Sequence, residues 1–169
     1  MSRALLALSL LGLFLVAIQL DILSDLRVAG VVIMAIWLWP FCIAIIGQTT
    51  AAIISGVALG LLFDALTSTP FGLTAVVGGL IAFGSIRLAR EGVGDLEGAA
   101  WWMTPLLAAI VGFLAPLLFV LMGIFTLDFS LWHGSLVASM LVNALFFALL
   151  ARPAARLIEF ASGTTRRRR

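Results

Sequence analysis

The stretch GVALGLLFD (Gly56–Asp64) and the TSTPFG segment shortly after it (Thr67–Gly72) are the most informative parts of this sequence. They place a single carboxylate, Asp64, at the end of an otherwise apolar segment. An Asp costs about 2.5–3.5 kcal/mol at the centre of a membrane helix and less near its end, so a chain this apolar is expected to use it. Three uses are open: a cap for the backbone N–H groups of the Pro70–Gly72 turn, a contact with a partner protein, or the binding of a cation or proton.

The composition indicates a membrane protein. Hydrophobic residues make up 63% of the 169 residues and charged residues only 11%, with a mean hydropathy of +1.24. A soluble domain carries about 25% charged residues, so this chain could not cover its apolar surface in water. We therefore predict one all-α, polytopic membrane domain over residues 1–169, with no room for a soluble domain of any size.

The breaks between apolar runs predict six membrane-spanning helices. The third run reaches only about 22 Å at 1.5 Å per residue, so a re-entrant segment with five full crossings is the alternative. The first run is expected to stay as a helix, because it is longer than the apolar part of a typical signal peptide and no small-residue cleavage site follows it. The predicted spans are residues 4–20, 28–46, 51–65, 71–88, 103–125 and 135–150, followed by an Arg-rich tail at 151–169.

The arginines predict the orientation, because basic residues accumulate on the cytoplasmic side. All ten basic residues are Arg, and six crossings from a cytoplasmic N-terminus leave only Arg27 outside. Both termini are therefore expected in the cytoplasm. The end of the tail is expected to bind anionic lipid headgroups, at about 1 kcal/mol per residue near the surface, and is too short to suggest nucleic-acid binding. It consists of Arg166, Arg167, Arg168 and Arg169.

Glycines at four-residue spacing indicate close helix packing in the third span. Gly56 and Gly60 lie on one helix face, extended by Ala52, and would let a neighbouring backbone approach. Gly78-Gly79 and Gly84 make the fourth span the expected mate within the chain, while packing against another chain is the alternative.

Two further polar residues are interpreted from their surroundings. His133 is the only histidine and is expected in an interfacial loop, since one His cannot build a zinc site without other ligands. Asn143, within the sixth span, is predicted to be a buried amide that makes an interhelical hydrogen bond. No cofactor or metal site is predicted.

The pattern Gly56-x-x-x-Gly60-Leu61-Leu62-x-Asp64, followed by Pro70-Phe71-Gly72, resembles the signature of the bacterial rod shape-determining protein MreD family. The resemblance extends to chain length, six hydrophobic segments, a short outer loop near the N-terminus and a basic C-terminal end. It implies partner docking or helix packing for five positions: Gly56, Gly60, Asp64, Pro70 and Gly72.

The resemblance also implies a function and a fold. Members of that family are non-catalytic components of the elongasome, the inner-membrane assembly that builds the lateral cell wall of rod-shaped bacteria. They bind the bitopic protein MreC and work with the actin-like MreB, the glycosyltransferase RodA and its penicillin-binding transpeptidase. The family's fold is similar to the six-helix substrate-binding subunits of energy-coupling-factor vitamin transporters.

Two other functions remain open. A substrate-binding subunit of such a transporter would have the same size, helix number and orientation, and its pocket would draw on Asn143, Trp132, His133 and Asp128. A lipid-modifying or proteolytic enzyme would need Asp64 and Asp128 to act as a pair. No recognised catalytic motif surrounds either carboxylate, so an enzyme is not expected.

Overall fold

The computed structural model describes residues 3–23, 27–28, 31–67, 69–92, 102–125 and 136–162. Within these ranges the regular structure is helical apart from one short strand pair, which confirms the predicted all-α class. The elements are α1 (Arg3–Ile18), the π-helix η1 (Gln19–Leu23), the strands β1 (Arg27–Val28) and β2 (Val31–Val32), the 3₁₀-helix η2 (Ala35–Trp37), and the helices α2 (Leu38–Ile45), α3 (Thr49–Leu66), α4 (Leu73–Gly92), α5 (Met103–Phe125) and α6 (Leu136–Ser162).

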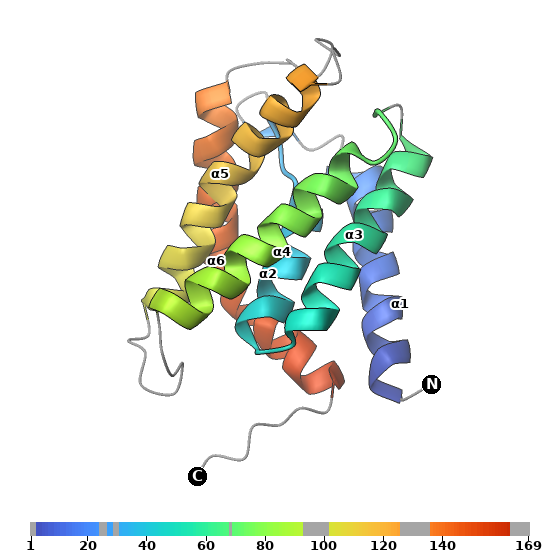
Figure 1. The fold of residues 1–169 in the computed structure, drawn as a ribbon, viewed down its shortest axis with the longest axis vertical. Helices are drawn as coiled ribbons and strands as arrows, with labels where there is room; N and C mark the ends of the chain where they lie inside the picture. Colours follow the sequence, from blue (N-terminus) through green and yellow to red (C-terminus); the bar gives the residue numbers. More distant parts are fainter. Residues whose placement is uncertain are drawn as a thin grey trace.

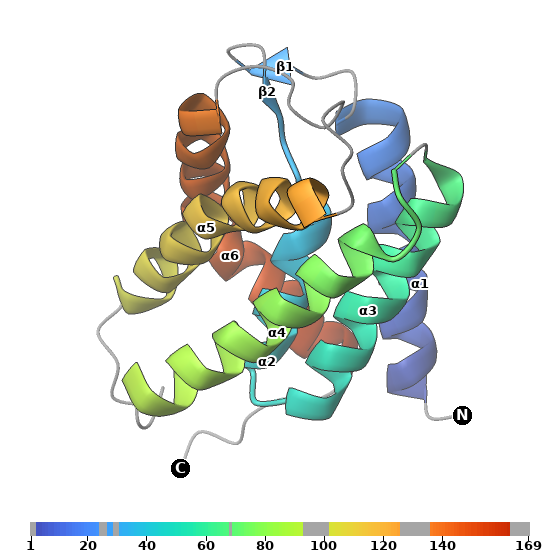
Figure 2. The ribbon, with the colours of Figure 1, turned by 45° about the horizontal axis from the view of Figure 1, so that its top comes forward.

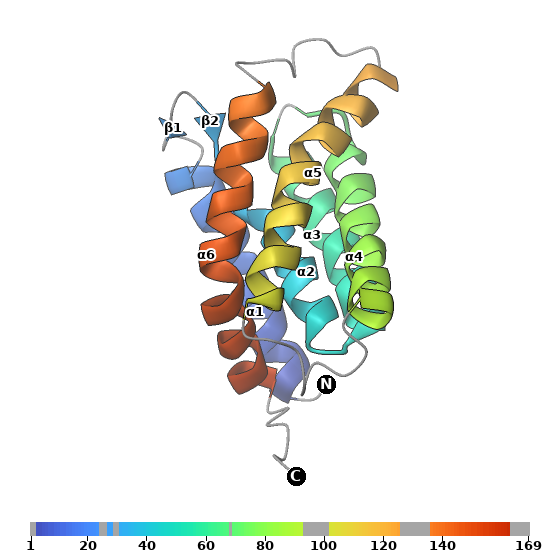
Figure 3. The ribbon, with the colours of Figure 1, turned by 90° about the vertical axis from the view of Figure 1, so that its left-hand side faces the viewer.

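The helices pack around the short central helix α2, which contacts α3, α4, α5 and α6. All eight of its residues are buried. The start of α1 and the end of α6 lie at one end of the bundle, while the α3–α4 turn lies at the other (Figure 1). A second view shows β1 and β2 at this opposite end, and a third shows α2 enclosed by the longer helices (Figures 2 and 3).

The structure contains the helices needed for a membrane protein. Four of the described helices, α3, α4, α5 and α6, are long and apolar enough to cross a bilayer. Two shorter apolar helical stretches, Leu8–Leu23 and Ala35–Ile45, complete the bundle. The fifth predicted span, 103–125, coincides with α5, and α3 is continuous over 18 residues rather than 15. The fourth predicted span is shifted, since α4 runs from Leu73 to Gly92.

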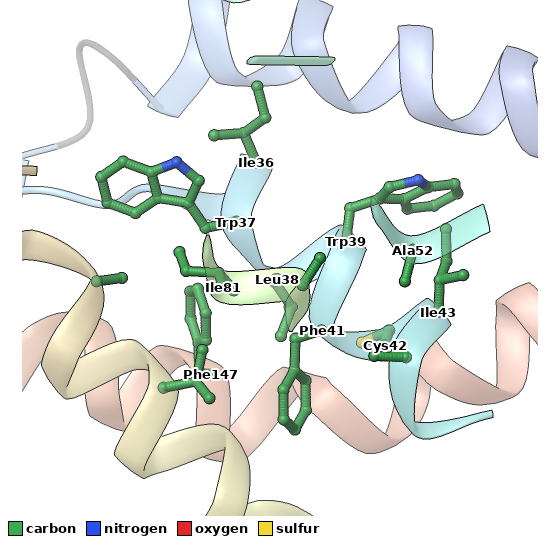
Figure 4. Close-up of a cluster of buried hydrophobic side chains, with 14 of the residues drawn as sticks. Ile36, Trp37, Leu38, Trp39, Phe41, Cys42, Ile43, Ala52, Ile81 and Phe147 are labelled. Carbon is green, nitrogen blue, oxygen red and sulfur yellow. The ribbon is translucent and has the colours of Figure 1, made fainter. Parts of the chain in front are cut away.

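The second predicted span, 28–46, is wrong as a helix. The chain instead forms the antiparallel pair of β1 and β2, continues without regular structure at Ile33 and Met34, and turns through η2 before α2 begins at Leu38. Pro40 lies in the first turn of α2, where its missing N–H costs no helical bond. Figure 4 shows Trp37, Phe41 and Cys42 of this segment among side chains of the neighbouring helices.

The sixth span was predicted to end at residue 150, shortly before Pro153, but α6 continues to Ser162 with Pro153 inside it. Pro removes one backbone hydrogen bond from a helix, which is the reason a stop was expected. Ala155 and Ile158, beyond the proline, belong to the hydrophobic core. Their burial holds the helix together past Pro153, and no local pattern reveals it. The first span was predicted at residues 4–20. Its α-helix ends at Ile18, and the chain continues as the π-helix η1 to Leu23.

Candidate functional site

The signature residues meet in the hairpin formed by α3 and α4, where Asp64 is the central side chain. It lies in the last turn of α3 and is 3% exposed. Its Oδ2 accepts the backbone N–H groups of Gly72 at 2.9 Å and Thr74 at 3.0 Å. Its Oδ1 accepts the hydroxyl of Thr69 at 2.9 Å and a longer bond from the Thr74 N–H at 3.3 Å.

These bonds make Asp64 the N-terminal cap of the next helix. The first N–H groups of α4 have no partner within the helix and carry the positive end of its dipole, so a carboxylate is the side chain that satisfies them best. The predicted capping role of Asp64 is therefore confirmed. The carboxylate is buried inside the protein, and its cost there is offset by these hydrogen bonds.

The turn between the two helices is shaped by Pro70 and Gly72. The carbonyl of Pro70 accepts the N–H of Leu73 at 3.0 Å, which closes a four-residue turn. Gly72 has φ +94°, a conformation that side-chain-bearing residues rarely adopt. The hydroxyl of Thr67 lies 2.9 Å from the carbonyl of Phe63 and 2.7 Å from the hydroxyl of Thr69. Each hydroxyl is thereby connected to Asp64 or to the end of α3.

The two glycines of α3 bring its backbone against that of α4. A Cβ added to Gly56 would lie 2.6 Å from the carbonyl oxygen of Gly78. One added to Gly60 would collide with the backbone of Thr74 and Ala75. Real Cβ atoms do not approach this closely, and backbone atoms cannot move aside as a flexible side chain can. The predicted close packing of the third span on the fourth is confirmed at Gly56 and Gly78, whereas a Cβ added to Gly84 would meet no atom within 4 Å.

The glycine face of α3, formed by Gly56 and Gly60, packs against α4 within the chain. Gly56 and Gly60 are buried within the chain by α4, so that face is occupied before any partner arrives. A docking surface for another transmembrane helix must lie elsewhere on the molecule. The exposed side of α3 carries larger apolar residues instead, such as Ile54 and Val57.

A second polar cluster holds the broken segment before α2. The side chain of Gln19 donates from Nε2 to the carbonyl of Ile33 at 2.8 Å. Asn143 of α6 accepts the N–H of Met34 at 2.9 Å and donates to the carbonyl of Ser139 at 2.9 Å. Non-helical backbone at membrane depth is tolerated only where protein or water satisfies it. The prediction that Asn143 is a buried amide is confirmed, but its partners are an irregular segment and its own helix rather than a neighbouring helix.

Three buried polar atoms of the described residues have no hydrogen-bond partner. They are Gln19 Oε1, Trp37 Nε1 and Thr74 Oγ1. Gln19 and Trp37 both belong to the region around the break, and the indole of Trp37 packs on Phe119 with ring centroids 5.5 Å apart. One acceptor and one donor are thus unused beside a discontinuous segment. Sequence reasoning missed Gln19, although a lone amide in the apolar run before Asp21 was the available signal.

Several predicted residues lie outside the part of the chain that the structure describes. They are Asp128, Trp132, His133 and the four terminal arginines, Arg166, Arg167, Arg168 and Arg169. The searched residues, which are the described ones, contain no group of three or more His, Cys, Asp or Glu placed to hold a metal ion. The site that the structure does bring together is therefore the capped hairpin of α3 and α4.

Comparison with models of known protein families, with curated proteins and with solved structures finds no match to this chain.

Proposed function

We propose that this chain is a non-catalytic membrane scaffold of the bacterial cell-wall elongation machinery, in which it binds MreC and helps to maintain rod shape. On this proposal it lies in the inner membrane with six crossings and both termini in the cytoplasm, and its fold is similar to that of the substrate-binding subunits of energy-coupling-factor transporters. MreB, RodA and the penicillin-binding transpeptidase would belong to the wider complex.

One observation supports the proposal above the others. The five residues on which the resemblance to the MreD family depends have connected structural roles in one hairpin. Asp64 caps α4, Gly72 adopts the positive φ that the turn requires, and Gly56 and Gly60 allow the two backbones to touch. A hairpin specified this tightly gives a rigid surface, which is what a scaffold offers to a partner.

The partner helix is expected on a lipid-facing surface, because the glycine face is already covered. The longer helices α1, α3, α4, α5 and α6 each expose large apolar side chains that would contact a neighbouring helix in the membrane. One position on each of four helices samples these surfaces: Phe14 on α1, Leu61 on α3, Val76 on α4 and Leu141 on α6.

The experiment is a site-specific photocrosslinking scan in the native membrane, preceded by a mild-detergent pull-down of the tagged full chain. Recovery of MreC, with crosslinks confined to one of the four positions, is the expected result. Phe147 is the matched control, because it is fully buried and a probe there should crosslink only within the chain. Failure to recover MreC, with the protein intact and inserted, would contradict the proposal.

The alternative is a substrate-binding subunit of a vitamin transporter, which a different observation favours. Discontinuous segments commonly form substrate sites in transporters, because their free backbone groups can bind a ligand. The segment before α2 is discontinuous in this way, and two buried polar atoms without a hydrogen-bond partner, Gln19 Oε1 and Trp37 Nε1, belong to the same region. Recovery of paired ATPases and a coupling subunit in the same pull-down would favour the transporter. A native mass spectrum without any bound small molecule would count against it.

A further inference from the structure

One exposed face of α4 changes from apolar to basic along its length. Val76, Leu80 and Phe83 are exposed on it, and so are Arg87 and Arg90. These residues follow one another at spacings of four, three, four and three. On a helix of 3.6 residues per turn they lie within an arc of about 80°, so they form one continuous stripe. We call these five residues the α4 stripe.

The basic end of the α4 stripe lies at the depth of the lipid headgroups. α4 is long and apolar enough to cross a bilayer, and Arg90 lies about 26 Å along the helix axis from Leu73. The core of a bilayer is about 30 Å thick, so the guanidinium groups can reach its edge on their flexible stems. α5 begins at the end of the bundle where α4 ends (Figure 1), and Trp102, which directly precedes α5, is exposed. Tryptophan accumulates at the membrane interface, which indicates the same depth.

The two arginines of the α4 stripe are placed to act together. The guanidinium carbon of Arg87 lies 5.4 Å from the centroid of the Phe83 ring, within the range of a cation–π interaction. Arg90 follows three residues later on the same face, where side chains of a helix are neighbours. Because arginine donates paired hydrogen bonds to phosphate oxygens, two guanidinium groups at this spacing can bind one phosphate between them.

The order of the side chains along the α4 stripe indicates what covers it. The basic end attracts an anion, and the apolar part directly beside it requires hydrocarbon. A free anion would leave the apolar part uncovered, whereas a phospholipid carries both groups in this order and at this depth. Residues 73–90 contain no acid that would neutralise the pair. On α6, at the same end of the bundle, Glu159 follows Arg156 by three residues, which weakens the attraction there.

We propose that the α4 stripe binds one anionic phospholipid, with its headgroup phosphate between Arg87 and Arg90 and an acyl chain along the apolar part of the stripe. Phe83 positions Arg87 for this contact. Each arginine near a membrane surface adds attraction for an anionic lipid, and the pair makes that attraction local. The site does not rest on the scaffold proposal, because it needs no partner protein.

The first test is native mass spectrometry of the purified full chain, released from nanodiscs of equal phosphatidylglycerol and phosphatidylcholine. The unaltered protein is expected to retain one phosphatidylglycerol in preference. Arg90→Gln, a change at an exposed position that should fold normally, is expected to lower this preference about fivefold, and Arg87→Gln with Arg90→Gln about twentyfold.

Arg156→Gln is the matched control, since it removes the same charge from an exposed position of α6 at the same end of the bundle. It should lower the preference less than twofold. Equal loss in Arg90→Gln and Arg156→Gln would overturn the proposal, because it would show a general effect of surface charge. An unchanged preference in the double variant would also overturn it, and would mean that acids of the chain itself, such as Glu91, neutralise the pair.

The second test separates paired hydrogen bonding from charge. Lysine at both positions, Arg87→Lys with Arg90→Lys, keeps the two charges but not the planar donor pairs. It should restore only part of the preference lost in the double glutamine variant, and full restoration would overturn the shared phosphate. Phe83→Leu keeps an apolar side chain but removes the ring, and should lower the preference about twofold. An unchanged preference in that variant would overturn the positioning of Arg87 by the ring.

Discussion

Two regions of the molecule satisfy buried backbone groups in different ways. In the α3–α4 hairpin, Asp64 binds N–H groups eight and ten residues further along the chain. In the segment from α1 to α2, Gln19 reaches a carbonyl 14 residues away and Asn143 reaches an N–H 109 residues away. The hairpin is closed by neighbours in sequence, whereas the broken segment depends on a helix from the far end of the chain.

The difference shows which kind of membrane structure a local pattern can specify. Regular helices satisfy their own backbone, so the hairpin needs help only at its turn. A segment without helical structure needs partners from other elements along its length. Substitutions at the turn or at the glycine contacts should therefore destabilise the hairpin. Substitution of a single amide side chain should destabilise the broken segment. The predictions that follow separate the two, beginning with the largest expected effect.

Gly60→Leu should destabilise the protein most, by about 3 kcal/mol or more, because the new side chain meets the backbone of α4 rather than a movable side chain. Unfolding in mixed detergent and sodium dodecyl sulfate micelles, followed by circular dichroism, measures this loss. Gly84→Leu is the matched control, since no atom lies within 4 Å of a Cβ at that position. Equal effects at the two glycines would show that close contact is not what the hairpin requires.

Asp64→Ala should cost about 2 kcal/mol, because it leaves the N–H groups of Gly72 and Thr74 without their acceptor at the start of α4. Hydrogen exchange at these two amides should rise, while exchange in the middle of α4 should not. Asp21→Ala, which removes an exposed carboxylate from η1, serves as the control. Unchanged protection at Thr74 in the Asp64 variant would contradict the capping role.

Asn143→Leu should cost about 1–2 kcal/mol, because the partly buried N–H of Met34 loses its acceptor. The effect should appear as faster proteolysis or exchange in the segment before α2 rather than in α6. Ser139→Ala is the control, since only the backbone carbonyl of Ser139 takes part in the Asn143 network. A uniform loss of stability across the bundle would argue against a local role for this amide.

Gln19→Met should have the smallest effect, below about 1 kcal/mol. The substitution removes the bond to Ile33 but also removes the buried acceptor Oε1, which has no partner, so the two effects oppose each other. Thermal unfolding of the detergent-solubilised protein, compared directly with Asn143→Leu, measures the difference. A larger loss than in the Asn143 variant would mean that Oε1 is satisfied in the folded protein, for example by a bound ligand.

Much of the helical bundle could be predicted from particular residues. The apolar run of α5 follows the Trp101-Trp102 pair and ends before Thr126 and Asp128, and its predicted limits coincide with the helix. The hairpin was also predictable, because Asp64, Pro70, Gly72 and the glycines are the residue types that a cap, a turn and a close backbone contact require. Asp64 could be assigned to the cap because the N–H groups that it binds are only eight and ten residues further along the chain.

Other features could not be predicted, and in each case a distant contact is the reason. The residues from 28 to 46 are apolar enough for a helix, yet Ile33 and Met34 have no regular structure, because Gln19 and Asn143 satisfy their backbone groups. Pro153 favours an end to α6, yet the helix continues because Ala155 and Ile158 enter the core. Neither the hydrogen bonds of Gln19 and Asn143 nor the core contacts of Ala155 and Ile158 can be inferred from the residues that flank these positions in the sequence.

Composition and local pattern were thus sufficient for the membrane class, for most of the helices and for the chemistry of the hairpin turn. These properties depend on side-chain polarity and on backbone geometry within a few residues. Folding of the whole chain settled two other matters: the break before α2 and the length of α6. They depend on which surfaces meet in three dimensions, because a buried backbone group or an apolar side chain can be satisfied by any element that packs against it.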